Sequence, residues 1–111
     1  MNTITWSEFE KIEIRAGTII DVSDFPESRN PSYKVTIDFG ELGIKRSAAQ
    51  ITKLYSKEEL LNKQIIAAIN FPVKQIANFF SECLVLGVYG ENKEVILLQP
   101  ERAVANGSKV G

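Results

Sequence analysis

The sequence predicts an all-β fold, a five-stranded Greek-key barrel with short helices at the N-terminus and between strands 3 and 4. Three observations carry this prediction. Apolar and polar residues alternate with the period of a half-buried strand over much of the first half of the chain. Unbroken apolar runs of strand length follow in the second half. Only two short stretches carry the sequence signals of a helix start.

The chain opens with a predicted short helix and a long first strand. Thr5-Trp6-Ser7-Glu8 has the form of a capping box, in which the Thr5 hydroxyl accepts a hydrogen bond from the Glu8 amide. Residues 12–22 then alternate, with Ile20 and the other even-numbered residues on one face of the strand. Gly17 within this run predicts a bulge or a coil of the strand, which helps a small barrel to close.

The remaining elements follow in the order of a small barrel. The second strand places Val35, Ile37 and Phe39 inward, together with Tyr33. The predicted segments are, in order, strands at 33–39 and 44–48, a capped helix that follows Ser56, and strands at 64–71, 83–89 and 94–98. Five strands with a helix between the third and the fourth are typical of the OB-fold.

The composition argues against an enzyme and against a cofactor or metal site. The chain has no histidine, so it lacks Ser-His and Cys-His pairs and the usual zinc ligands. Its seven glycines are scattered and form no phosphate-binding loop. Its single cysteine, Cys83, lies in an apolar run and is predicted to be a small core residue. A non-enzymatic binding protein is therefore expected.

The same composition predicts one cytoplasmic domain without membrane insertion. The apolar fraction of 44% and the charged fraction of 24% are ordinary for a globular protein. The apolar runs are far shorter than the roughly 20 residues of a membrane-spanning helix. The first residues have neither the basic patch nor the apolar core of a secretion signal.

Two features of the central region indicate a binding surface. The net charge is −1, but residues 43–79 carry six cations against two anions, which is the pattern of a localised polyanion site. An ordinary solvated surface is the alternative. Residues 70–82 are predicted to be a polar, aromatic-rich loop that leads into a buried apolar strand at 83–89. A loop at the mouth of a barrel strand is a common place for recognition.

Five ordered segments give the chain a family resemblance. The segments are Glu13–Ile19, Phe25–Glu41, Lys45–Ile51, Asn70–Glu82 and Leu97–Gly111. They resemble the tRNA-binding domain found at the end of some methionyl-tRNA synthetases and in related stand-alone proteins. The resemblance spans nearly the whole chain and is nearest to a short stand-alone bacterial member. Residues 1–111 are accordingly expected to form a single domain of this type.

The resemblance implies a homodimer that binds tRNA or other structured RNA, and it implies candidates for the contacts. The cations expected near phosphates are Lys45, Arg46, Lys53 and Lys74, with Arg15 as a further candidate. The residues expected near base or sugar edges are Asn70, Gln75, Phe79, Ser81 and Glu82. The loop carries fewer cations than is usual in the family, which predicts weaker binding with a shallower salt dependence.

The nearest likeness also implies an alternative function, an export-related chaperone that holds unfolded polypeptides. Phe79 and Phe80 are the candidates for that apolar surface, although one of the two rings is equally well a core residue. The dimer interface is expected to use the N-terminal helical extension (1–11) and the C-terminal extension (99–111), through Ile4, Trp6, Phe9, Val104, Ala105 and Val110. The alternative is that the N-terminal helix caps its own barrel.

Overall fold

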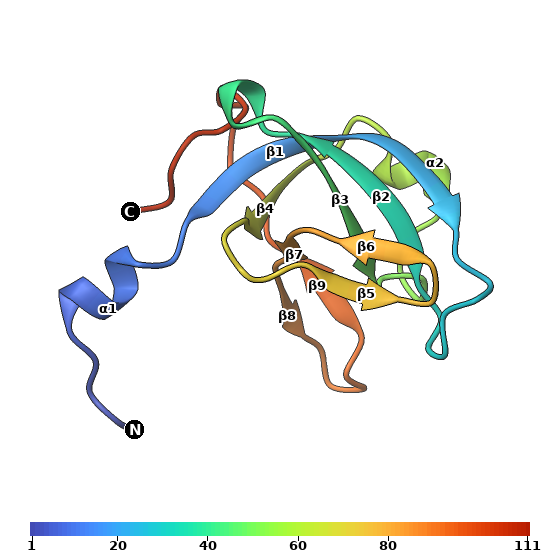
Figure 1. Cartoon of the computed structure of the whole chain (residues 1–111), viewed down its shortest axis with the longest axis horizontal. Helices are drawn as coiled ribbons and strands as arrows, with labels where there is room; N and C mark the ends of the chain where they lie inside the picture. The colour runs from blue at the N-terminus through green and yellow to red at the C-terminus, as the bar shows by residue number, and fades with distance from the viewer.

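The computed structural model describes all 111 residues and contains the predicted five-stranded antiparallel barrel (Figure 1). The strands of the main sheet run in the order β3-β2-β1-β4-β7. Their bounds are β1 Ile14–Asp24, β2 Tyr33–Asp38, β3 Ile44–Ala49, β4 Gln64–Ala68 and β7 Leu84–Val85. The two ends of the sheet approach each other where the Glu82 amide donates to the Arg46 carbonyl oxygen at 2.8 Å, so the barrel is nearly closed.

Two small hairpins and three short helical segments complete the fold. The hairpins are β5 Lys74–Ile76 with β6 Phe79–Ser81, and β8 Gly87–Tyr89 with β9 Val95–Leu97. The helical segments are α1 Trp6–Glu10, η1 Gly40–Leu42 and α2 Lys57–Leu60. Both predicted capping boxes are present, from Thr5 to Glu8 and from Ser56 to Glu59. None of these helices is long and apolar enough to cross a membrane.

The core lies inside the barrel and is built largely from the predicted inward residues. Val35, Ile37 and Phe39 of the second strand region are fully buried, as the alternation indicated. They pack in one cluster with Ile65 of β4 and with Leu60, which α2 supplies. Burying a side chain of this size contributes about 1.5–3 kcal/mol. The capping box of α2 therefore matters because it holds Leu60 against the core.

The predicted alternation of β1 is wrong at Ile19 and Ile20, and Val22 packs against the core again. The register of β1 against β2 shifts between Ile19 and Asp21, so Ile19 is fully buried and Ile20 is 41% exposed. Gly17 does not form this irregularity. A Cβ atom at Gly17 would lie 2.7 Å from Ile37 Cγ2 and equally close to the Phe39 ring, so glycine leaves room for these two core side chains.

The predicted apolar strand at 83–89 is broken in two, and the preceding strand ends at Ala68 instead of Phe71. The chain changes partners at Leu86, whose amide donates to Ile66 while its carbonyl oxygen accepts from Leu98. Leu84 pairs with Ala68 on the outer face of the sheet and is therefore exposed, contrary to the prediction that this run is buried. The predicted loop at 70–82 likewise contains a regular hairpin, β5 with β6.

The C-terminal extension packs on its own barrel. β2 leaves the first residues of β1 unpaired, and residues 107–110 fill that edge through main-chain hydrogen bonds to Ile14 and Ala16. The Gln64 side chain donates to the Val104 carbonyl oxygen and accepts from the Val104 amide. We call this junction of residues 99–111 with β1 and β4 the C-terminal seam.

The N-terminal helix does not cap the barrel. α1 lies to one side of the barrel in Figure 1, and none of its residues is buried. Trp6 is 83% exposed, and Ile4 is also exposed. The alternative that this helix covers its own barrel is therefore wrong for the single subunit.

Candidate nucleic-acid interface

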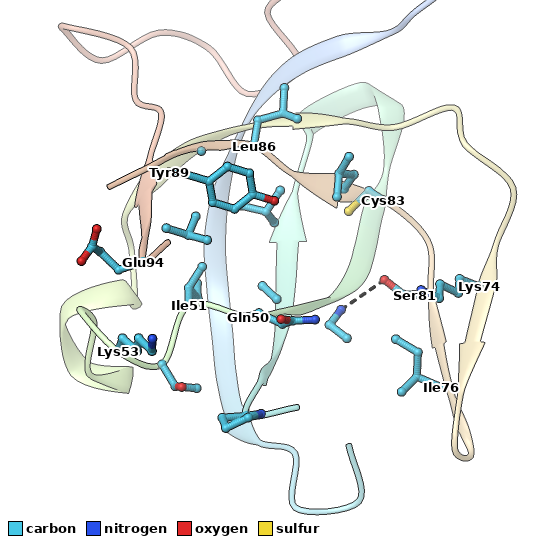
Figure 2. Close-up of a pocket in the computed structure, with 18 of the residues that line it drawn as sticks. Gln50, Ile51, Lys53, Lys74, Ile76, Ser81, Cys83, Leu86, Tyr89 and Glu94 are labelled. Carbon is cyan, nitrogen blue, oxygen red and sulfur yellow. Dashed lines mark hydrogen bonds between the residues drawn. The ribbon is translucent and has the colours of Figure 1, made fainter. Parts of the chain in front are cut away.

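A groove of about 740 Å³ opens beside the C-terminal end of β3 (Figure 2). One wall comes from the β5–β6 hairpin, a second from residues 50–54, and a third from the chain between Cys83 and Val95. Pro31, from the loop between β1 and β2, also lines it. In five-stranded barrels of this type, the face of the second and third strands and the flanking loops is the usual ligand site. We call this feature the β3 groove.

Positive charge predominates in the β3 groove. Lys53, Lys74 and Lys93 line it, against a single carboxylate, Glu94. The local balance is thus two positive charges, within a chain of net charge −1. Figure 2 shows Lys53 and Lys74 on opposite sides of the groove. Two of the four cations predicted from the central region are therefore brought together, and Lys93 joins them.

Lys93 was not predicted as a binding residue, because it belongs to a turn far along the chain from the central block of cations. It follows Asn92 in the tight turn between β8 and β9 and has a positive φ of 63°. Tyr89, at the end of β8, was missed for a different reason, since it was assigned to a buried strand. Its ring is 80% exposed and lies in the groove. The adjacent turn glycine, Gly90, is the signal that this residue stands at a strand end.

The other predicted cations lie outside the groove. Arg46 holds its guanidinium carbon 4.4 Å from the centre of the Phe79 ring, a cation–π contact. Lys45 is half-buried in β3 near Cys83.

Cys83 is a buried core residue, as predicted. Burial raises the pKa of its thiol to about 11, with Glu82 adding to the shift, so the thiol stays protonated.

The assignment of Phe79 to a base contact needs correction. Phe79 is buried, with its ring centre 5.3 Å from that of Phe25. The Lys34 ammonium lies over both rings, at 4.8 Å from Phe25 and 5.5 Å from Phe79. The ring therefore fastens the β5–β6 hairpin to the barrel. Phe80, its neighbour, is the exposed member of the pair, at 53%.

Ser81 and Glu82 use their side chains to close the barrel. The Ala48 amide donates to Ser81 Oγ at 3.1 Å, which is the dashed line in Figure 2. The Arg46 amide donates to Glu82 Oε1 at 2.9 Å. Both side chains therefore have a structural role on β3, and their expected contacts with base edges stay a prediction. Ser81 nevertheless lines the groove.

Three further candidates are also engaged inside the protein. The Asn70 side chain donates to the Lys11 carbonyl oxygen and accepts from the Glu13 amide, so it ties the N-terminal extension to the end of β4. Gln75 donates to the Ala77 carbonyl oxygen within the hairpin turn. Arg15 donates to the Gly107 carbonyl oxygen at the C-terminal seam and pairs with Glu13, whose pKa this hydrogen bond lowers.

The exposed aromatic and amide groups of the groove are ones the sequence did not single out. Phe71, just beyond β4, is 51% exposed and lines the groove with Tyr89. Gln50 also lines the groove (Figure 2), and its side chain makes no hydrogen bond within the protein. The β3 groove therefore combines free ammonium groups, exposed rings and an unused amide. That set suits a ligand with phosphates and flat bases.

Comparisons with known proteins match the whole fold. The crystal structure of chaperone CsaA from Bacillus anthracis str. Ames is 44% identical and covers 99% of this chain and 100% of that one, with a TM-score of 0.94. The CsaA chaperone protein from Picrophilus torridus is 52% identical over 98% of this chain and 100% of that one, with a TM-score of 0.92. These two matches confirm the predicted nearness to a short stand-alone family member.

A curated relative places the same domain in a larger enzyme. The methionine–tRNA ligase of Pyrococcus furiosus is 33% identical over 110 residues, which cover 99% of this chain but only 15% of the ligase. The model of the putative tRNA binding domain matches residues 14–109, from the start of β1 to the C-terminal seam. The chain therefore belongs to the family of putative tRNA-binding domains.

Proposed function

We propose that this protein is a non-enzymatic, cytoplasmic homodimer that binds tRNA or other structured RNA in the β3 groove. The observation that carries the proposal is the set of three lysines that face one glutamate there, in a chain that is otherwise net acidic. A polyanion gains from such a local field even when the whole protein does not attract it. The family match and the ligase relative support RNA as that polyanion.

Removing two groove cations tests the proposal. Lys53→Ala combined with Lys74→Ala is expected to weaken tRNA retention in a gel shift at low salt. The slope of log K against log salt is expected to become shallower by about 0.7–0.9 per lost phosphate contact. Lys11→Ala with Lys57→Ala removes the same charge outside the groove and serves as the control. Equal loss in both double variants would contradict a groove site.

The proposed homodimer is supported by two apolar surfaces that do not meet within the subunit. One is on the N-terminal extension, at Ile4 and Trp6, and the other is the exposed cross-strand pair Val88 and Ile96 on β8 and β9. In a twofold dimer each surface can cover the other across the axis. Of the residues expected at the C-terminal side, Val104 remains exposed, while the Val110 amide is bonded to Ile14.

Deleting residues 1–9 tests the dimer. The shortened chain is expected to have half the wild-type mass in solution, because the deletion removes Trp6 and leaves the barrel intact. Light scattering measures the mass, and the far-ultraviolet spectrum checks that the barrel remains folded. A dimer of unchanged stability after the deletion would refute this interface.

A second candidate function is the export-related holding of unfolded polypeptides. Apolar residues line more than half of the same groove, and Phe80 is exposed on the hairpin beside it. The two CsaA structures are named chaperones, which supports this candidate. Phe80→Ser is expected to reduce the suppression of client aggregation and to leave tRNA retention unchanged. If suppression is also unchanged, this ring has no part in polypeptide holding.

A further inference from the structure

We infer, on the basis of the proposed function, that the β3 groove holds an unpaired segment of RNA and not the flank of a double helix. Bases of that segment stack on Phe71 and Tyr89. Its phosphates approach Lys53, Lys74 and Lys93, and the Gln50 amide hydrogen-bonds to a base edge. The structured RNA of the proposed function is thus recognised through a loop, bulge or end.

The two exposed rings provide the first argument. Phe71 and Tyr89 are 51% and 80% exposed and line one groove, although they come from segments 18 positions apart in the chain. Within a duplex, neighbouring base pairs cover the face of each base, so a side-chain ring can stack only on unpaired or terminal bases. Each such contact contributes about 1–3 kcal/mol and tolerates any base.

The size of the groove provides the second argument. A volume of about 740 Å³ lies within the range of sites that enclose a drug-sized ligand, which is also the size of one or two nucleotides. A double helix is recognised differently, by contacts across its wide minor groove to phosphates and 2′-hydroxyls. A small concave site lined by both apolar and polar residues fits bases better than it fits that convex surface.

Charge selects RNA over polypeptide as the occupant. The three lysines come from three different walls of the groove, namely residues 50–54, the β5–β6 hairpin and the β8–β9 turn. None of them takes part in an ion pair, since the ion pairs of the chain are formed by Arg15, Lys57 and Arg102. A strand with a phosphate at every residue can contact all three, whereas an unfolded chain of mixed charge has no such repeat.

Three RNA probes test the inference by fluorescence anisotropy at low salt. One is a short unstructured oligonucleotide, the second a blunt duplex of equal charge, and the third the same duplex with an unpaired 3′ extension. The first and third are expected to bind more tightly than the blunt duplex. Phe71→Ala and Tyr89→Ala are each expected to weaken binding of the unpaired probes about five-fold or more, the factor that corresponds to 1 kcal/mol.

Matched variants separate stacking from general effects. Phe80→Ala removes a ring of almost equal exposure that lies outside the groove, and it is expected to leave binding unchanged. Tyr89→Phe keeps the ring and is expected to retain binding. Thermal melting of each variant checks that the barrel is folded.

Each result has a distinct consequence. The inference is overturned if the blunt duplex binds as tightly as the unpaired probes, or if neither ring variant weakens binding. The proposed function still stands in that case if Lys53→Ala with Lys74→Ala loses tRNA retention. If the ring variants lower only the suppression of polypeptide aggregation, the groove holds polypeptide and the inference is also overturned. If no RNA binds at low salt, the proposed function itself fails.

Discussion

The β3 groove and the C-terminal seam contain the same kinds of side chain but use them in opposite ways. At the seam, Gln64 is hydrogen-bonded to Val104 and Asn106, and Arg15 donates to Gly107 and pairs with Glu13. In the groove, the amide of Gln50 and the nearby lysines have no partner within the protein. The seam leaves one buried polar atom, Arg15 Nε, without a partner. Residue type alone therefore does not locate a binding surface. Unpaired groups that are also exposed, such as those of Gln50 and the groove lysines, are the better guide.

The largest expected effect concerns the β5–β6 hairpin, because the Phe79 ring is buried against the barrel and the Phe80 ring is exposed. Phe79→Ala is expected to lower the free energy of unfolding by about 3–5 kcal/mol, since it removes a buried ring that contacts Phe25 and Arg46. Urea denaturation measures the loss. Phe80→Ala is the control and is expected to change the stability by less than about 0.5 kcal/mol. A similar cost for both would show that Phe79 is not the anchor.

The same pair of rings shows what sequence could and could not predict. The alternation in β2 identified Val35, Ile37 and Phe39 correctly, because one face of that strand meets the core along its whole length. It could not choose between Phe79 and Phe80, since that choice depends on how the hairpin docks on β3. The register shift after Ile19 moved the buried position by one residue, and an alternating pattern contains no record of such a shift.

The site was less predictable than the fold for a related reason. Of the cations in the central block, Lys53 and Lys74 line the groove, but Lys57 pairs with Asp24 away from it. Ser81 and Glu82 each accept a hydrogen bond from a main-chain amide of β3, which their residue types did not indicate. Tyr89 was predicted to be buried because the sequence does not show that the strand changes partners at Leu86, a change that depends on the fold of the whole barrel. Local sequence does not encode which hydrogen bonds the rest of the protein will supply.

Effects of intermediate size are expected when the two glutamines, one at the seam and one in the groove, are replaced by alanine. Gln64→Ala is expected to cost about 0.5–1.5 kcal/mol of stability, because it removes the hydrogen bonds to the main-chain groups of Val104, which are exposed enough for water to replace them. Gln50→Ala is expected to leave stability unchanged and to weaken binding of an unpaired RNA. Urea denaturation and fluorescence anisotropy on both variants give a two-by-two result. The structure indicates that the Gln50 amide is free. If Gln50→Ala destabilises the barrel, that conclusion is wrong.

The smallest expected effect concerns the ion pair of the seam and its response to acid. The hydrogen bond from Arg15 holds the pKa of Glu13 below its ordinary value of 4.5. Because the folded-state pKa is the lower one, the pair stabilises the protein fully above pH 4.5 and loses that contribution as the pH falls through the folded-state value. Glu13→Gln is therefore expected to be slightly less stable than the wild type at pH 7.

Comparing the two proteins isolates this one group, since the other carboxylates titrate identically in both. The difference between their urea midpoints is expected to shrink steadily as the pH falls below 4.5, because protonated Glu13 no longer forms the pair. The pair is exposed and screened by salt, so the difference is small at every pH. A difference that stays constant down to low pH would mean that only the Gly107 carbonyl oxygen holds Arg15. Glu13 would then form no stabilising contact within the protein, like the lysines of the groove.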